Sequence, residues 1–232
     1  MRRTSRRHYV AILAVALAIV ILLAILRFAE GGSLRNVEID RDRGEVRFSA
    51  VVEPGAMARP FGVQGHHAIV WENGGSSRMA LFRAKATDLE VRAALESLGA
   101  RAGENLTEQT WTERENTTNP AADERVEGAP IEVFVSWKGK DRVPLGALLL
   151  LHKSRPPRDH FDFRYGGNER FRDAFKSGCI VCLYSCPGGS IGNRTSTIRD
   201  FVRDGVVYTA NEDELPKAGT PVIITLRMSS RS

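Results

Sequence analysis

Three cysteines in a short glycine-rich segment are the residues best suited to chemistry. Cys179, Cys182 and Cys186 are the only cysteines of the 232-residue chain, and all lie in the stretch SGCIVCLYSCPGG, residues 177–189. Their spacing, C-x2-C-x3-C-P, matches the last three cysteines and the proline of the bacterial ferredoxin run C-x2-C-x2-C-x3-C-P. The spacing therefore predicts three thiolate ligands of an iron–sulfur cluster that serves electron transfer.

The predicted ligand set is incomplete, because Lys176 stands where the first cysteine of that run would fall. A four-iron cluster would need a fourth ligand from elsewhere; otherwise it would hold three irons or leave one iron open. Zinc bound by three cysteines and one histidine is the alternative metal. The candidate histidines are His66, His67, His152 and His160.

A disulfide is a further alternative, either Cys179–Cys182 or Cys179–Cys186, with one thiol left over. A bridge across so short a loop adds little stability, since the entropy removed from the unfolded chain grows with loop length. The competing hypothesis is therefore a non-enzymatic binding or scaffold domain whose cysteine loop is closed by a disulfide or by zinc. The sequence does not decide whether the protein is an enzyme, and it has no Gly-rich phosphate loop or HExxH helix.

The N-terminus carries an uncharged apolar run at residues 9–26, which as a helix would span about 27 Å. It predicts a transmembrane anchor over residues 9–27, between a basic cytoplasmic tail, residues 1–8, and a linker, residues 28–36. Four arginines precede the run, so the positive-inside rule predicts a single-pass protein of the cell membrane with residues 37–232 outside the cytoplasm. The segment SRRHYV, residues 5–10, also resembles a twin-arginine export motif, which serves folded, cofactor-loaded proteins.

The net charge of +5 comes from the N-terminus alone. Five of the 33 basic residues lie in residues 1–27, which contain no acidic residue, so the rest of the chain carries 28 charges of each sign. This balance gives no support to a nucleic-acid partner. The expected partners are the membrane and a redox protein.

Hydrophobic periodicity indicates the elements that position the cysteines. Alternation predicts a half-buried strand at residues 46–52, and further strands at 66–72, 131–137, 206–210 and 221–228. The clearest helix covers residues 87–99, where Thr87 and Glu90 form a capping box; a shorter one covers 196–205, and residues 101–129 read as a long loop. This order predicts an α+β fold: a single N-terminal transmembrane helix, then one mixed or antiparallel sheet with one or two short packed helices.

Four segments together resemble the YdjY-like family of bacterial proteins: HHAIVWENGG at 66–75, ALFRAKATDLEVRAALESLGARAGENL at 80–106, FRYGGN at 163–168 and SGCIVCLYSCPGGSIGN at 177–193. The resemblance runs from about Val46 to Met228. It implies an iron–sulfur cluster on Cys179, Cys182 and Cys186, and it implies no substrate because the family is largely uncharacterised.

Overall fold

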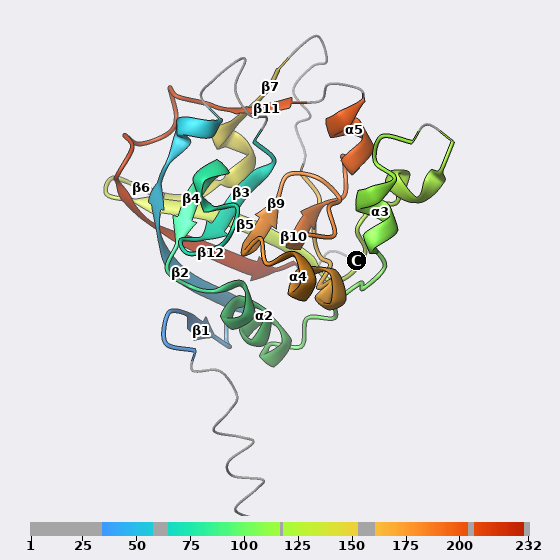
Figure 1. Ribbon diagram of the computed structural model, residues 1–232. Helices are drawn as coiled ribbons and strands as arrows, with labels where there is room; N and C mark the ends of the chain where they lie inside the picture. Colours follow the sequence, from blue (N-terminus) through green and yellow to red (C-terminus); the bar gives the residue numbers. More distant parts are fainter. Residues whose placement is uncertain (1–33, 58–64, 117, 153–160, 204–206, 230–232) are drawn as a thin grey trace, which may run out of the picture. The chain divides into compact units, whose positions relative to one another are not determined.

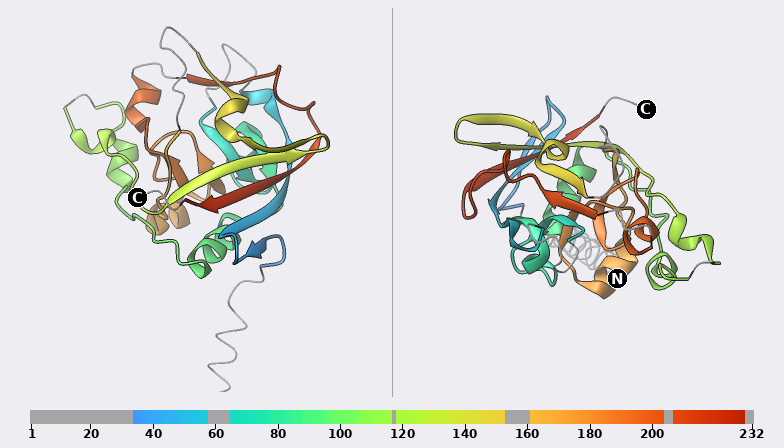
Figure 2. Two further views of the ribbon diagram at one scale, coloured as in Figure 1. Left: turned by 180° about the vertical axis from the view of Figure 1, so that it is seen from behind. Right: turned by 90° about the horizontal axis from the view of Figure 1, so that it is seen from above.

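The computed structural model describes residues 34–57, 65–116, 118–152, 161–203 and 207–229. Most of its strands form one sheet that curves until it closes on itself (Figures 1 and 2). The strands of the closed ring, in spatial order, are β2 (Glu45–Val52), β12 (Pro221–Met228), β5 (Pro130–Trp137), β8 (Phe163–Tyr165), β10 (Gly189–Asn193), β9 (Cys179–Cys182), β3 (His67–Trp71) and β4 (Ala80–Ala84). Pairing of β4 with β2 closes the ring.

Neighbouring strands of the ring are antiparallel, except that β10 runs parallel to β9 and β3 runs parallel to β4. Two short strands extend the ring at its margins: β1 (Glu38–Asp40) pairs with β2, and β6 (Lys140–Pro144) forms a hairpin with β5. A separate two-stranded sheet joins β7 (Leu149–His152) to β11 (Val207–Ala210).

The alternation read from the sequence produces the core of this sheet. Val46, Phe48 and Ala50 of β2 are buried, whereas Ser49 between them is exposed. The register sets Phe48 of β2 opposite Ile224 of β12, so apolar residues of adjoining strands share one face and pack together. The strands predicted at residues 46–52, 131–137 and 221–228 are therefore confirmed.

The helices are short and lie outside the sheet. They are α2 (Asp88–Ser97), α3 (Glu108–Thr112), α4 (Glu169–Phe175) and α5 (Ile198–Val202). The predicted capping box of α2 is present: Thr87 accepts a hydrogen bond from the Glu90 N–H at 3.0 Å, and Glu90 accepts one from the Thr87 N–H at 2.8 Å. The predicted loop at residues 101–129 is wrong in part, because it contains α3 and a 3-10 turn, Pro120–Asp123.

The predicted fold class is also wrong. The sequence predicts strands one by one, but closure depends on pairings such as β2 with β12 and with β4, between segments far apart in the chain. Hydrophobic periodicity carries no information about such partners. The domain is thus a closed, mainly antiparallel sheet with short helices on its outside.

The prediction of a single-pass membrane protein needs correction. No helix of the described residues combines the length and the apolar character needed to cross a membrane, and the longest of them, α2, has 10 residues. The predicted anchor, residues 9–27, and the basic tail, residues 1–8, lie outside the described residues. An uncharged run of sufficient length is necessary for a transmembrane helix but does not by itself establish one.

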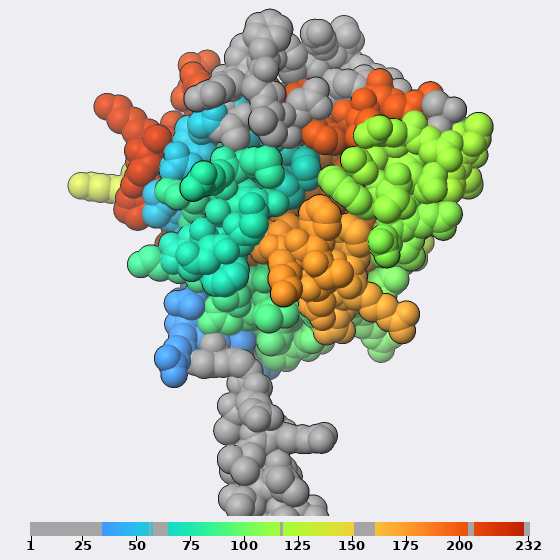
Figure 3. Space-filling model, viewed as in Figure 1, coloured from blue at the N-terminus to red at the C-terminus, as the bar shows by residue number. Residues whose placement is uncertain are grey.

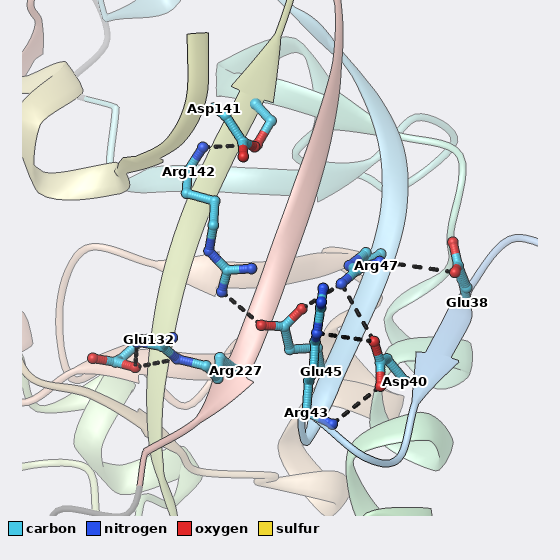
Figure 4. A network of polar contacts seen from close by, with 10 residues as sticks. Glu38, Asp40, Arg43, Glu45, Arg47, Glu132, Asp141, Arg142 and Arg227 are labelled. Atoms are coloured by element: carbon cyan, nitrogen blue, oxygen red, sulfur yellow. Dashed lines mark hydrogen bonds and ion pairs between the residues drawn. The ribbon is translucent and has the colours of Figure 1, made fainter.

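A network of charged side chains ties β2 to β6 across β12 (Figure 4). Glu45 is only 1% exposed, and its two oxygens each lie 2.6 Å from a guanidinium, one from Arg47 and one from Arg142. The hydrogen bond from Arg142 is the largest cause that lowers the pKa of Glu45, which falls to about 2 against the opposing effect of burial. Glu45 is therefore a buried carboxylate that stays ionised.

Candidate functional site

The three cysteines lie on β9 and in the turn that follows it. Cys179 and Cys182 are the two ends of β9, and Cys186 lies in the turn that leads into β10. All three side chains are at most 2% exposed, and all three are free thiols. The structure thus places the three predicted site residues together in the interior.

The pairing of β9 with β3 is irregular beside the cysteines. Ile69 of β3 is opposite Val181, whereas the next residue, Val70, is opposite Cys179, and a second shift lies between His67 and Ile69. On its other side β9 pairs regularly with β10, with Gly189 opposite Cys179 and Gly192 opposite Cys182. Irregular pairing of this kind is over-represented next to functional sites.

Cys182 is the centre of the cluster. Its thiol interacts with those of Cys179 and Cys186, and it donates a hydrogen bond to the carbonyl oxygen of His66 at 3.3 Å. Burial raises the pKa of Cys182 well above its ordinary value. The hydrogen bond with Cys182, and then burial, raise the pKa of Cys186 in the same way. These two thiols are therefore protonated at neutral pH.

Two of the four candidate histidines lie beside the thiols. His67 on β3 is directly opposite Cys182 on β9, and His66 precedes it, with the two imidazole centroids 3.8 Å apart. Directly opposite residues place their side chains on the same face of a sheet. Burial, and then the neighbouring His66, lower the pKa of His67 well below its ordinary value, so its ring is neutral. His160 and the side chain of His152 lie outside the described residues.

An aromatic layer covers this part of the sheet, contributed by the short helices that Figure 1 shows beside β9 and β10. The ring of His66 lies 4.9 Å from that of Phe201 on α5 and 6.2 Å from that of Trp111 on α3. Phe175 of α4 packs against Trp111 and stacks on Phe171. Figure 3 shows α4 (orange) filling the surface between residues 65–100 and the segment that contains α3.

Glycines allow the chain to pack this closely around the thiols. Gly167 and Gly178 have positive φ angles, +71° and +70°, which glycine adopts without strain. Gly189 has a different role, because a Cβ atom at this position would lie 2.8 Å from the Cβ of Cys182. A side chain there would push Cys182 out of place.

The arginines that flank the loop in sequence are mostly engaged elsewhere. Arg164 pairs with Asp162 at 2.7 Å, and the buried Arg172 pairs with Asp88 at 2.6 Å. The cation that acts on the thiols is Arg114, whose charge works to lower the pKa of Cys186 although the net shift is upward. Its guanidinium stacks 4.3 Å from the ring centroid of Trp111. Because Arg114 and Trp111 are about seventy positions before the loop, no local sequence signal could have identified them.

The cluster supplies three sulfur donors and not a complete metal site. Among the described ranges, no three histidine, cysteine or carboxylate side chains are arranged to hold a metal ion as they stand. Cys182 interacts with the thiols of both Cys179 and Cys186, and the pKa values of Cys182 and Cys186 are raised. A metal centre would require the thiols to lose their protons.

Comparisons with known proteins agree with the resemblance seen in the sequence. The model of the YdjY domain matches residues 37–227. The uncharacterized protein YdjY of Escherichia coli (strain K12) is 29% identical over 164 residues, which cover 70% of this chain and 67% of that protein. No solved structure matches. The cysteine cluster and its closed sheet therefore belong to a member of the YdjY family.

Proposed function

We propose that the domain acts through its buried three-cysteine cluster, with Cys179, Cys182 and Cys186 as the ligands of an iron–sulfur cluster that transfers electrons to a redox protein. The observation that carries this proposal is the convergence of three thiols on Cys182 inside the protein. A single buried structural cysteine is ordinarily inert. Three buried thiols that interact with one another favour a common ligand.

The surroundings of the thiols would shield a bound cluster from solvent. Reduction potentials of such clusters depend on hydrogen bonds to sulfur and on exposure to solvent, and here the three cysteines are at most 2% exposed. Three cysteines leave one iron of a four-iron cluster without a thiolate. His67 is the best-placed donor for it, since it faces Cys182 across the sheet and its Nδ1 has no hydrogen-bond partner among the described residues.

Aromatic side chains offer a route for electrons to the surface. The sulfur of Cys186 and the ring of Phe171 both lie beside Gly188. A Cβ atom added to this glycine would lie 3.7 Å from that sulfur and 3.6 Å from that ring. Phe171 stacks on Phe175, which is 48% exposed. A partner that docks over Phe175 would therefore approach the thiols through two packed rings.

The second candidate is a non-enzymatic binding domain in which Cys182 forms a disulfide with Cys179 or Cys186. The same interactions favour it, because Cys182 interacts with both of the other thiols. Formation of this disulfide from two thiols would release two protons and two electrons. The electrons would reduce a disulfide of the partner to two thiols. Zinc held by the three cysteines and a histidine is the metal-bound form of this candidate.

Metal analysis of matched variants separates these functions. We would purify the wild type, Cys182→Ser and the control Ser190→Ala without oxygen, and determine iron, acid-labile sulfide and zinc per chain. Ser190 is a suitable control because its hydroxyl is buried on the neighbouring strand β10 and has no hydrogen-bond partner in the described part of the chain. We expect several irons in the wild type and the control, and an iron content at least tenfold lower in Cys182→Ser.

Two results would contradict the electron-transfer proposal. Zinc in place of iron would favour a structural metal site. A metal-free chain whose mass is two units below that calculated from its sequence would establish a disulfide. The non-enzymatic binding domain would then be the remaining candidate.

A further inference from the structure

A shallow cavity of about 590 Å³ lies on the outer face of the sheet, where the β5–β6 hairpin meets β12. Figure 2 (left) shows this hairpin, in yellow-green, beside the red strand β12. None of the residues around this cavity belongs to the thiol cluster. Its volume is within the range of cavities that hold small organic ligands.

The register of three adjacent strands forms the floor. Ile223 of β12 pairs with Ser49 of β2 on one side and with Ser136 of β5 on the other. Directly opposite residues share a face, so Ser49, Ile223 and Ser136 lie in one row across the three strands. Ile223 is 44% exposed, and the two small neighbours leave a hollow around it. The floor is therefore apolar although it faces outward.

Trp137 forms the wall. It is the last residue of β5, and the pairing with β6 changes register between Val135 and Trp137. A shift of this kind re-aims the side chain that follows it, and Trp137 lines the cavity. An indole beside an exposed isoleucine gives a surface that suits an acyl chain or an aromatic ring.

Positive charge lies at the rim. Lys138 and Lys140 line the cavity with one acidic residue, Asp141, whose carboxylate already accepts a hydrogen bond from Ser136 at 2.8 Å. Lys140 lies 3.7 Å from Glu214, and both side chains of that pair are more than half exposed. Lys138 is exposed and makes no ion pair with another described residue. The three charged residues that line the cavity, two lysines and one aspartate, therefore carry a net charge of +1, and Glu214 lies outside the lining.

We propose that this cavity binds a small amphipathic carboxylate, with its apolar body on Ile223 and Trp137 and its carboxylate at Lys138. Ile223 and Trp137 supply affinity through burial of the apolar body, and Lys138, the lining lysine that has no ion pair with another described residue, selects for an anion. This inference does not depend on the function proposed for the cysteines.

The test is a titration of the full chain with octanoate, and with octanamide as the uncharged analogue of the same length. The readout is the indole N–H signals of the three tryptophans in two-dimensional NMR spectra, with that of Trp137 identified by its loss in Trp137→Phe. We expect a saturable shift of the Trp137 signal with octanoate, and at least twofold weaker binding of octanamide.

Matched substitutions locate the two parts of the site. Lys138→Gln is expected to weaken octanoate binding about two- to fivefold, as for other exposed charge pairs, and to leave octanamide unchanged. Lys85→Gln, an exposed lysine elsewhere, is the control for charge. Ile223→Ser is expected to weaken both ligands, with Leu89→Ser, an exposed leucine of α2, as its control.

Equal binding of the amide and the carboxylate would overturn the assignment of an anion. Shifts shared equally by all three indoles, or no saturable shift at Trp137, would overturn the site.

Discussion

Glu45 and Cys182 are both almost completely buried, yet the protein keeps the first as an anion and the second as a neutral thiol. Glu45 has two guanidiniums at 2.6 Å, so ionisation is favoured despite burial. Cys182 has thiols and a carbonyl oxygen around it, and ionisation there is disfavoured. The difference teaches that the partners, and not burial alone, decide the charge state of a buried group.

The two regions also differ in what they can do next. The Glu45 network is satisfied by its own cations and needs nothing further, as expected of a structural element (Figure 4). Among the described residues, the cation that acts on the thiol cluster is Arg114, whose charge favours the Cys186 thiolate. A metal centre would provide the missing positive charge, because metal binding deprotonates thiols.

The largest effect is expected from removing one of the cations beside Glu45. Arg142→Met leaves the buried carboxylate with Arg47 alone, and we expect the free energy of unfolding at pH 7 to fall by about 3 kcal/mol. Urea unfolding measures this change. Arg43→Met is the control: Arg43 pairs with Asp40 at 3.9 Å and its side chain is 67% exposed, so the loss should stay below about 0.5 kcal/mol. Equal losses in both variants would contradict the account of Glu45.

The free energy of unfolding should depend on pH in opposite directions for the two regions: the contribution of Glu45 is lost in acid and that of Cys182 in alkali. The folded-state pKa of Glu45 is lowered from 4.5 to about 2, so its contribution is present above pH 4.5 and is lost as the pH falls towards 2. We expect a loss of about 2 kcal/mol over this interval. The loss should be smaller in Glu45→Gln, and an unchanged acid limb in that variant would refute the prediction.

The raised pKa of Cys182 acts on the alkaline side. Its contribution is fully present below the ordinary thiol pKa, about 8.5, and decreases as the pH rises above that value. Between pH 8 and 10.5, the free energy of unfolding should therefore fall more steeply with rising pH in the metal-free wild type than in Cys182→Ser. Parallel curves would show that Cys182 ionises as readily in the folded chain as in the unfolded one.

Packing around the thiols can be tested without changing a cysteine. Gly189→Ala would bring a Cβ within 2.8 Å of the Cβ of Cys182, and overpacking of this kind costs about 1–3 kcal/mol. Gly55→Ala is the control, because no atom of the described residues lies within 4 Å of its added Cβ. We also expect Gly189→Ala to lower the iron content. A variant as stable as the wild type would mean that Cys182 has room to move.

The smallest effect is expected at Arg114. Arg114→Gln removes the cation that favours the Cys186 thiolate, so alkylation of Cys186 at pH 9 should become about twofold slower. Mass spectrometry of the alkylated peptide measures the rate, with Arg78→Gln, an exposed arginine, as the control. A rate that is unchanged, or changed equally in both variants, would remove Arg114 from the site.

Local features of this protein could be predicted and long-range ones could not. The alternation of β2 and the capping box of α2 depend on neighbours in the chain, and both predictions are confirmed. The closed sheet, the irregular pairing beside Cys179 and the position of His67 opposite Cys182 depend on β3 pairing with β9, more than a hundred residues away. The cysteines were found from spacing alone, whereas Trp111 and Arg114 required the fold.

The most direct test of the central claim is a visible absorption spectrum of the wild-type protein, purified without oxygen, before and after addition of dithionite. An iron–sulfur cluster on Cys179, Cys182 and Cys186 predicts a brown protein whose broad absorption bleaches on reduction. A colourless protein without iron, folded and with its three thiols accounted for as free or disulfide-bonded, would contradict the account.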